Sequence, residues 1–190
     1  MGWMFSSCYS LETINLSNFN TKKVIYMNHM FSFCNSLKIL DLSSFNTENV
    51  INLAYMFSYC KSLTIINISN FNTQNVENMN AMFYSCTNLK SINLSSFITK
   101  KASNMRIMFD SCYSLTSINI SNFYINSSVN ISHMFKACKN LTFIDISSFH
   151  RNTCDYIYKN VPEKGKLFMS NDYYNWTKNC IPPGWEIFTR

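Results

Sequence analysis

Hydrophobic positions recur with one fixed period along most of this 190-residue chain. Cysteine marks the period, and a Met-Phe pair before it and a run of leucine and isoleucine after it keep the same spacing. Six copies follow one another without insertion or deletion, so the chain is a repeat array. The cysteines of the array are Cys8, Cys34, Cys60, Cys86, Cys112 and Cys138.

Each repeat combines two hydrophobic rhythms. Ile14 and Leu16 alternate with polar residues, which is the two-residue period of a short strand. Val24, Met27 and Met30 follow at steps of three residues, which places them on one stripe of a helix. The repeat is therefore predicted to contain a strand, a turn and a short helix.

Threonines precede the predicted helices and suit the N-cap position, where a hydroxyl accepts a backbone N–H. They are Thr21, Thr47, Thr73 and Thr99. In the fifth unit Ile125 replaces the threonine, so Ser127 or Ser128 would be the cap. Parallel crossovers are right-handed, so residues 1–150 are predicted to form a right-handed α/β solenoid of six 26-residue strand–helix units.

Residues 151–190 lack the repeat and are predicted to form a small C-terminal β cap. Short apolar runs at 167–169 and 185–188 lie between turn-forming residues and predict strands. At the other end, the chain starts in the middle of a unit. This start fits either a piece of a longer array or a first turn that Trp3 covers.

Two phrases carry a family resemblance: Met-Phe-Ser-Tyr-Cys-Lys-Ser-Leu-Thr at 56–64 and Ile-Ser-Asn-Phe-Asn-Thr-Gln-Asn-Val at 68–76. They resemble the BspA-like leucine-rich-repeat proteins, and the similarity extends over about residues 4–150 and to the Pro-Pro-Gly-Trp tail. The resemblance implies a leucine-rich-repeat-like solenoid that is secreted or displayed on the cell surface, where some members act in adhesion. The chain as written has no evident secretion signal, so surface location is expected from the resemblance alone.

Composition excludes several classes of protein. The chain is 47% hydrophobic and 14% charged with a net charge of +6, which is incompatible with intrinsic disorder. No apolar run approaches the roughly 18 residues of a transmembrane helix, so membrane insertion is not expected. Lysines and arginines form no stripe interleaved with aromatic residues, so we expect no nucleic-acid partner.

The repeated cysteines are expected to form a ladder of buried thiols about 5 Å apart. Cys154 and Cys180 lie in the cap and are the better candidates for a disulfide. No two cysteines have the spacing of two to four residues typical of a structural zinc site, so no metal and no cofactor are expected.

The outward positions of the predicted strands form the candidate binding face. Solenoids use such extended faces to bind partners. Its polar row consists of Asn15, Asp41, Asn67, Asn93, Asn119 and Asp145. Beside this row, Ile39 and Ile65 make an apolar patch.

No catalytic group of residues emerges, and we expect no enzyme. Asp41 and Asp145 stand four units apart, too far for a carboxylate pair. The favoured function is recognition or adhesion through the strand face, with a protein or cell-surface macromolecule as the partner. A structural spacer without a ligand is the alternative. An enzyme would need a pocket in the cap around Cys154, Asp172 and Cys180.

Overall fold

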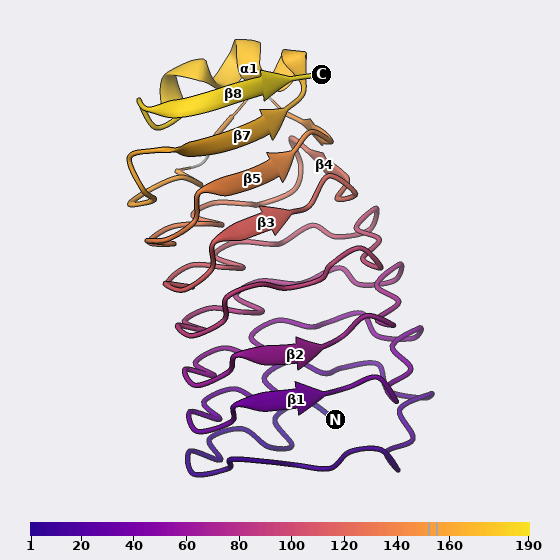
Figure 1. Cartoon of the computed structure of the whole chain (residues 1–190). Helices are drawn as coiled ribbons and strands as arrows, with labels where there is room; N and C mark the ends of the chain where they lie inside the picture. The colour runs from indigo at the N-terminus through magenta and orange to yellow at the C-terminus, as the bar shows by residue number, and fades with distance from the viewer. Residues whose placement is uncertain (152, 155) are drawn as a thin grey trace.

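The computed structural model describes residues 1–151, 153–154 and 156–190. The chain winds into a β-solenoid of about six turns with little helix (Figure 1). Strands at corresponding positions of the turns lie one above another along one side of the coil. They are β1 (Ile39–Asp41), β2 (Ile65–Asn67), β3 (Ser117–Asn119), β5 (Phe143–Ile146), β7 (Gly165–Met169) and β8 (Trp185–Thr189). We call this side the strand face.

All strand pairs among the described residues are parallel, and two of them keep the 26-residue repeat. Ile39 pairs with Ile65, and Ser117 pairs with Phe143, each with the equivalent position of the next repeat. The strand face contains a two-stranded sheet, β1-β2, and a four-stranded sheet, β3-β5-β7-β8. A small sheet on another side joins β4 (Ile125–Asn126) to β6 (Phe149–His150).

The predicted helix of each repeat is wrong. The segment that carries Val24, Met27 and Met30 consists of turns and one isolated bridge. Its backbone N–H groups do not follow the helical pattern of bonds to residues four positions back. Met27 N donates to Asn52 O of the next coil at 3.0 Å, and Met30 N donates to Met27 O, three positions back, at 3.3 Å. Apolar side chains recur every three or four residues here because the chain turns a corner at that interval, and this spacing mimics a helical stripe.

The corners place two residues per coil in the left-handed backbone region, with φ between 50° and 64°. None of these residues is glycine. In order of coil they are Trp3 and Ser7, His29 and Phe33, Tyr55 and Tyr59, Ala81 and Ser85, Ile107 and Ser111, His133 and Ala137, and Tyr156 and Asn160. Such a conformation costs about 1–2 kcal/mol for an L-residue. Hydrogen bonds between coils offset this cost, as when His29 N donates to Ala54 O at 2.9 Å.

The buried threonines do not cap helices but join successive coils. Thr21 Oγ1 donates to Asn46 O at 2.9 Å and accepts from Asn46 N at 2.8 Å. Thr47, Thr73 and Thr99 repeat both bonds one coil later each time. In the fifth unit, where Ile125 has no hydroxyl, backbone pairing between β4 and β6 links the coils instead.

The core is a set of columns in which like residues stack. The phenylalanines of the Met-Phe pairs lie with ring centroids 5.3–6.0 Å apart from Phe5 to Phe135. The repeat cysteines are free thiols, and all but Cys8 are buried. Each buried thiol donates to a carbonyl of the preceding coil; Cys60 Sγ, for example, lies 3.1 Å from Phe31 O. Burial raises the pKa of Cys34 to about 12.

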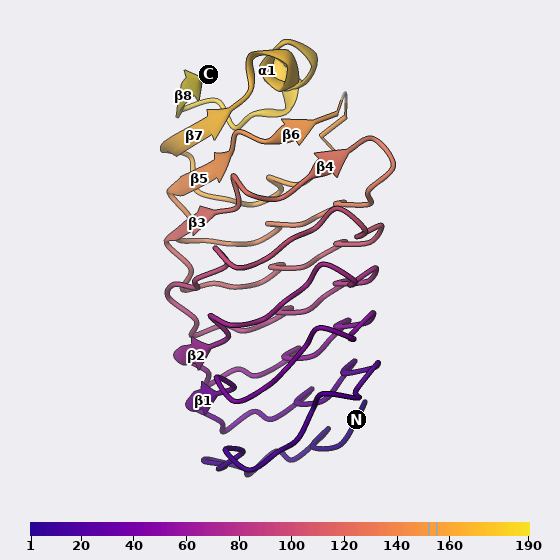
Figure 2. The same cartoon turned by 90° about the vertical axis from the view of Figure 1, so that its right-hand side faces the viewer.

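The C-terminal segment continues the coil instead of simply covering it. Residues in the left-handed backbone region recur at Tyr156 and Asn160. They correspond to His133 and Ala137 of the preceding coil, so fewer than 26 residues separate equivalent positions and this turn is shorter than a full repeat. β7 and β8 form where the apolar runs predict strands. The helix α1 (Asn171–Thr177) and a 3₁₀ turn (Lys178–Cys180) are not predicted, and α1 lies above β6 while β8 lies above β7 (Figure 2). No helix in the described part of the chain combines the length and the hydrophobicity needed to cross a bilayer.

Candidate functional site

The polar row of the strand face forms the turns that follow the strands. In each repeat, an Asn or Asp Oδ1 accepts the backbone N–H of the serine two residues later. These distances are 3.0 Å for Asn15, 2.9 Å for Asp41, 3.3 Å for Asn67, 3.0 Å for Asn93, 3.0 Å for Asn119 and 3.1 Å for Asp145. These side chains close Asx turns, so one oxygen of each is already bound to the backbone.

Two members of the row also bond to each other. Asn67 Nδ2 donates to Asp41 Oδ1 at 3.0 Å, across the paired strands β1 and β2. The Ser43 backbone N–H, together with the Ser43 and Asn67 side chains, holds the pKa of Asp41 below its usual range. The row therefore carries a fixed negative charge at Asp41.

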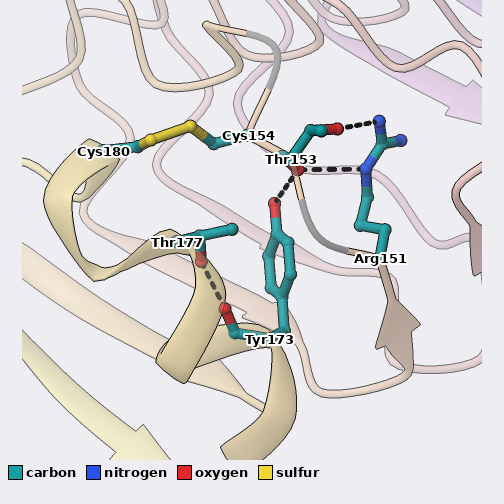
Figure 3. Close-up of a disulfide and its surroundings, with 6 residues drawn as sticks. All are labelled: Arg151, Thr153, Cys154, Tyr173, Thr177 and Cys180. Carbon is teal, nitrogen blue, oxygen red and sulfur yellow. Dashed lines mark hydrogen bonds between the residues drawn. A yellow bond between two sulfur atoms is a disulfide. The ribbon is translucent and has the colours of Figure 1, made fainter.

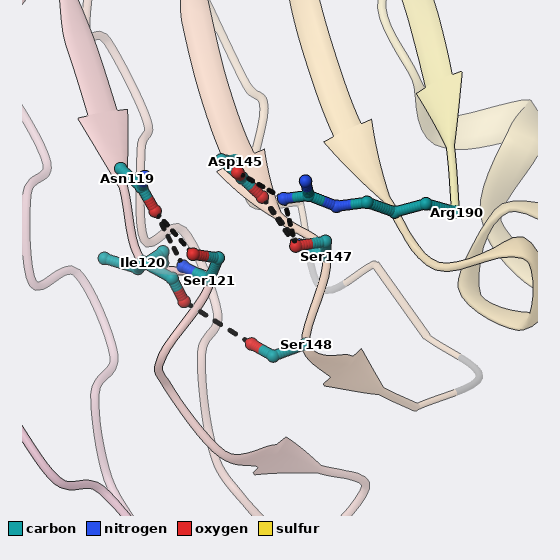
Figure 4. Close-up of polar contacts among 7 residues, drawn as sticks. All are labelled: Asn119, Ile120, Ser121, Asp145, Ser147, Ser148 and Arg190. Atoms are coloured by element: carbon teal, nitrogen blue, oxygen red, sulfur yellow. Dashed lines mark hydrogen bonds and ion pairs between the residues drawn. The ribbon is translucent and has the colours of Figure 1, made fainter.

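At the C-terminal end of the row, Asp145 is buried and paired. Arg190 Nη2 lies 2.7 Å from Asp145 Oδ2 and 2.8 Å from Ser147 Oγ (Figure 4). The Asp145 side chain is 8% exposed and that of Arg190 is 59% exposed. The charge that this end of the face presents to solvent is therefore the guanidinium rather than the carboxylate.

The predicted apolar patch lies on adjacent strands. Ile39 and Ile65 are direct partners in β1 and β2 and are 56% and 58% exposed. The patch is small, because the next residue in this row, Ser91, is polar and Asp41 and Asn67 flank it.

The structure adds an aromatic group that the sequence analysis did not find. Phe143, Phe168 and Phe188 lie on the strand face near its C-terminal end. The centroid distances are 5.3 Å from Phe143 to Phe168 and 4.6 Å from Phe168 to Phe188. We call these three residues the aromatic strip.

Two cations flank the aromatic strip. The Arg190 guanidinium lies 5.8 Å from the Phe168 centroid, and Lys166 Nζ lies 6.0 Å from the Phe188 centroid. A hollow of about 430 Å³ opens beside Phe143 and Lys166, with Gly165 and Gly184 also lining it. In the predicted strand 185–188, Phe188 has the same parity as the polar Glu186, which assigns it to the outward side. The predicted strand 167–169 is apolar throughout, so the outward parity of Phe168 follows only when Lys166 is included in the strand.

The cap residues named for an enzyme occupy different places. Cys154 and Cys180 are joined by a disulfide with a Cα–Cα distance of 6.3 Å (Figure 3). They border a largely apolar hollow of about 720 Å³ with Tyr156. Asp172 lies in the first turn of α1 and does not line this hollow.

The segment beside the disulfide is fixed by buried polar contacts. Arg151 Nε donates to Thr153 O at 3.0 Å, and Arg151 Nη1 donates to Val129 O at 2.8 Å. From the helix side, Tyr173 OH donates to the same Thr153 carbonyl at 3.4 Å (Figure 3). These bonds and the disulfide attach α1 to the last complete coil.

The comparisons with known proteins identify one family. The chain matches the family described as "Mycoplasma protein of unknown function, DUF285" over residues 1–65 and 60–176. No curated protein and no solved structure matches it. Because the two matches together extend over most of the sequence, the chain belongs to the DUF285 family.

Proposed function

We propose that this protein is a non-enzymatic recognition module that binds another macromolecule through the strand face, with the aromatic strip as the centre of contact. One observation carries the proposal: Phe143, Phe168 and Phe188 lie together on the strand face, with Arg190 beside them. Aromatic residues and arginine dominate the binding energy of protein interfaces, where a few residues supply most of the affinity.

The remainder of the face supports this division of roles. The Asn and Asp side chains bond to serine N–H groups of their own turns and hold the backbone in shape. Polar side chains held in this way suit the rim of an interface, because rim contacts exclude water and contribute little energy. Phe188 is 39% exposed, so a partner that covers it would bury apolar area now in water.

The surface location and the role in adhesion are part of the proposal. Both rest on the similarity of residues 4–150 to BspA-like leucine-rich-repeat proteins. This relationship is itself part of the proposal. Protease treatment of intact source cells tests the location, with peptides from residues 22–101 detected by mass spectrometry. Release of these peptides without cell lysis is the expected result, and protection until lysis would remove the surface role.

Binding is tested by surface plasmon resonance of the whole chain against a panel of purified extracellular-matrix proteins and cell-surface extracts. For any partner that binds saturably, Phe168→Ser and Phe188→Ser are expected to weaken the affinity at least tenfold. The matched control is Tyr26→Ser, because Tyr26 is 52% exposed and lies in the row of isolated bridges, away from the strand face. Equal affinity in all variants would contradict the proposed face, and absence of any saturable partner would favour the spacer.

A further inference from the structure

β8 has an inner edge, which pairs with β7, and an outer edge. β8 is the terminal strand of the four-stranded sheet and pairs with β7 over five residues, from Trp185 to Thr189. Within the described residues, no strand pairs with its other edge. In Figure 2, β8 and α1 lie at one end of the coil.

Strand register identifies the backbone groups that point outward. Lys166 N donates to Thr142 O at 2.7 Å, and Arg190 N donates to Met169 O at 3.2 Å, so each strand uses its even-numbered positions here to bond to the preceding coil. In a parallel strand, alternate residues direct both N–H and C=O to the same side. Ile187 and Thr189 therefore point their backbone groups away from β7.

This edge lacks the features that usually prevent strand addition. Proteins protect free edges with proline, bulges, several charges or very short strands. β8 is Trp-Glu-Ile-Phe-Thr, as long as β7, with one charged residue and no proline. Ile187 is only half-buried on the core side and Phe188 is exposed on the strand face, so apolar surface is open to solvent on both sides of the edge.

We propose that β8 accepts an extended peptide segment of a partner protein, which adds to the sheet as a parallel strand. The residue pairs between β7 and β8 indicate which side chains this segment would carry, because equivalent positions of neighbouring coils in a solenoid carry residues that pack on each other. Lys166 faces Glu186 at 3.9 Å, Leu167 pairs with Ile187, and Phe168 stacks on Phe188. To form the same kinds of pair with Glu186, Ile187 and Phe188, the added segment needs a basic, an aliphatic and an aromatic residue in succession.

The register also gives the hydrogen bonds of the added strand. The basic residue, opposite Glu186, would donate its N–H to Trp185 O and accept from Ile187 N. The aromatic residue, opposite Phe188, would donate to Ile187 O and accept from Thr189 N. Main-chain bonds of this kind supply affinity in strand addition, and alternate side chains supply specificity.

The sequence of β7, Gly-Lys-Leu-Phe-Met, fits this pattern and provides the probe. Fluorescence anisotropy of the labelled, end-capped pentapeptide is measured against the whole chain. Thr189→Pro removes an outward N–H while leaving the bonds to β7, and it is expected to weaken binding about tenfold, the effect of one backbone hydrogen bond. Thr189→Val keeps the N–H and is expected to bind like the wild type.

Charge exchange tests the register. Glu186→Lys is expected to lose affinity for the lysine peptide and to recover it for a peptide with Glu in place of Lys. Phe168→Ser separates this site from the strand-face proposal, because Phe168 lies on β7: pentapeptide binding is expected to persist, whereas binding of a face partner is lost. The circular-dichroism spectrum of each variant checks that the fold is intact.

Three results would overturn the proposal. The first is that the pentapeptide shows no saturable binding at millimolar concentration. The second is that Thr189→Pro and Thr189→Val bind it equally. The third is that the wild-type chain dimerises in sedimentation experiments and Thr189→Pro prevents this dimerisation. The last result would assign the edge to a second copy rather than to a partner peptide.

Discussion

Thr47 and Asn72 form a reciprocal pair across two coils: the Thr47 hydroxyl donates to Asn72 O at 3.0 Å and accepts from Asn72 N at 2.8 Å. Thr47 is 1% exposed, so water does not replace these bonds if the hydroxyl is removed. Thr47→Val keeps the shape of the side chain and leaves a buried donor and acceptor of Asn72 unpaired. We expect a loss of about 1–3 kcal/mol in the free energy of unfolding, measured by urea denaturation.

Thr64→Val is the matched control for this prediction. The Thr64 hydroxyl also donates to the preceding coil, to Lys38 O at 3.0 Å, but the contact is exposed and water can replace it. Its expected effect is within about 0.5 kcal/mol of zero. Similar losses of unfolding free energy at both positions would contradict the stabilising role of burial at Thr47.

Ile107 has φ of 50°, a conformation that a β-branched side chain disfavours. Ile107→Asn is expected to increase stability by about 1 kcal/mol, because asparagine tolerates the left-handed region and Ile107 is only half-buried. Thermal unfolding followed by circular dichroism measures the change. Ile51→Asn is the control at a half-buried position outside the left-handed set, and a gain there equal to that at 107 would remove the backbone explanation.

These left-handed corners also explain what could and could not be predicted from the sequence. The fixed repeat and the alternation around Leu40 and Ile118 place β1 and β3 correctly. The helix prediction fails because spacings of three or four residues describe a corner as well as a helix. The composition of the first such segment also argues against a helix. Residues 20–29 are Asn-Thr-Lys-Lys-Val-Ile-Tyr-Met-Asn-His, which include two asparagines, a residue that favours turns, and no alanine or leucine, which favour helices.

The candidate site could be predicted only in part. The row from Asn15 to Asp145 is periodic, and its position follows from the strand rhythm. Its bonding to the serine N–H groups is a consequence of turn geometry that the alternation alone does not reveal. The aromatic strip depends on the register of β5, β7 and β8. Asp145 pairs with Phe168 and Phe168 pairs with Phe188, so the step between coils shortens twice after β5 and no fixed period aligns these strands.

His29 gives the fold a pH dependence. Its ring stacks between Trp3 at 3.7 Å and Tyr55 at 4.7 Å, and burial lowers its pKa from the ordinary value of 6.5. The folded state therefore binds a proton less readily than the unfolded chain, so this stabilisation is present above pH 6.5 and is lost as the pH falls below it. His29→Tyr, which copies the residue of the next coil, is expected to flatten the decline of Tm between pH 7.5 and 5.5. An unchanged slope in this variant would contradict the assignment to His29.

The cysteine ladder predicts a sharp contrast in thiol reactivity. Burial raises the pKa of Cys60, Cys86, Cys112 and Cys138 well above the usual range, and the thiolate is the reactive form. Brief alkylation of the native protein at pH 8 is expected to modify Cys8, which is half-buried, long before these four. Mass spectrometry of the peptides measures the order. In urea all repeat cysteines should react at similar rates. Labelling of Cys86 in the native protein at the rate of Cys8 would contradict the prediction that burial protects the Cys86 thiol.

The most direct test of the proposed recognition face is a photo-crosslinker placed at Phe188 and, in a matched variant, at Tyr26. Each whole-chain variant is added to intact cells whose surface proteins are labelled, irradiated and analysed for covalent adducts. We expect a discrete adduct from position 188 and none from position 26, since Phe188 belongs to the aromatic strip and Tyr26 lies on another side of the coil. An adduct from position 26 with none from position 188 would contradict the proposed recognition face.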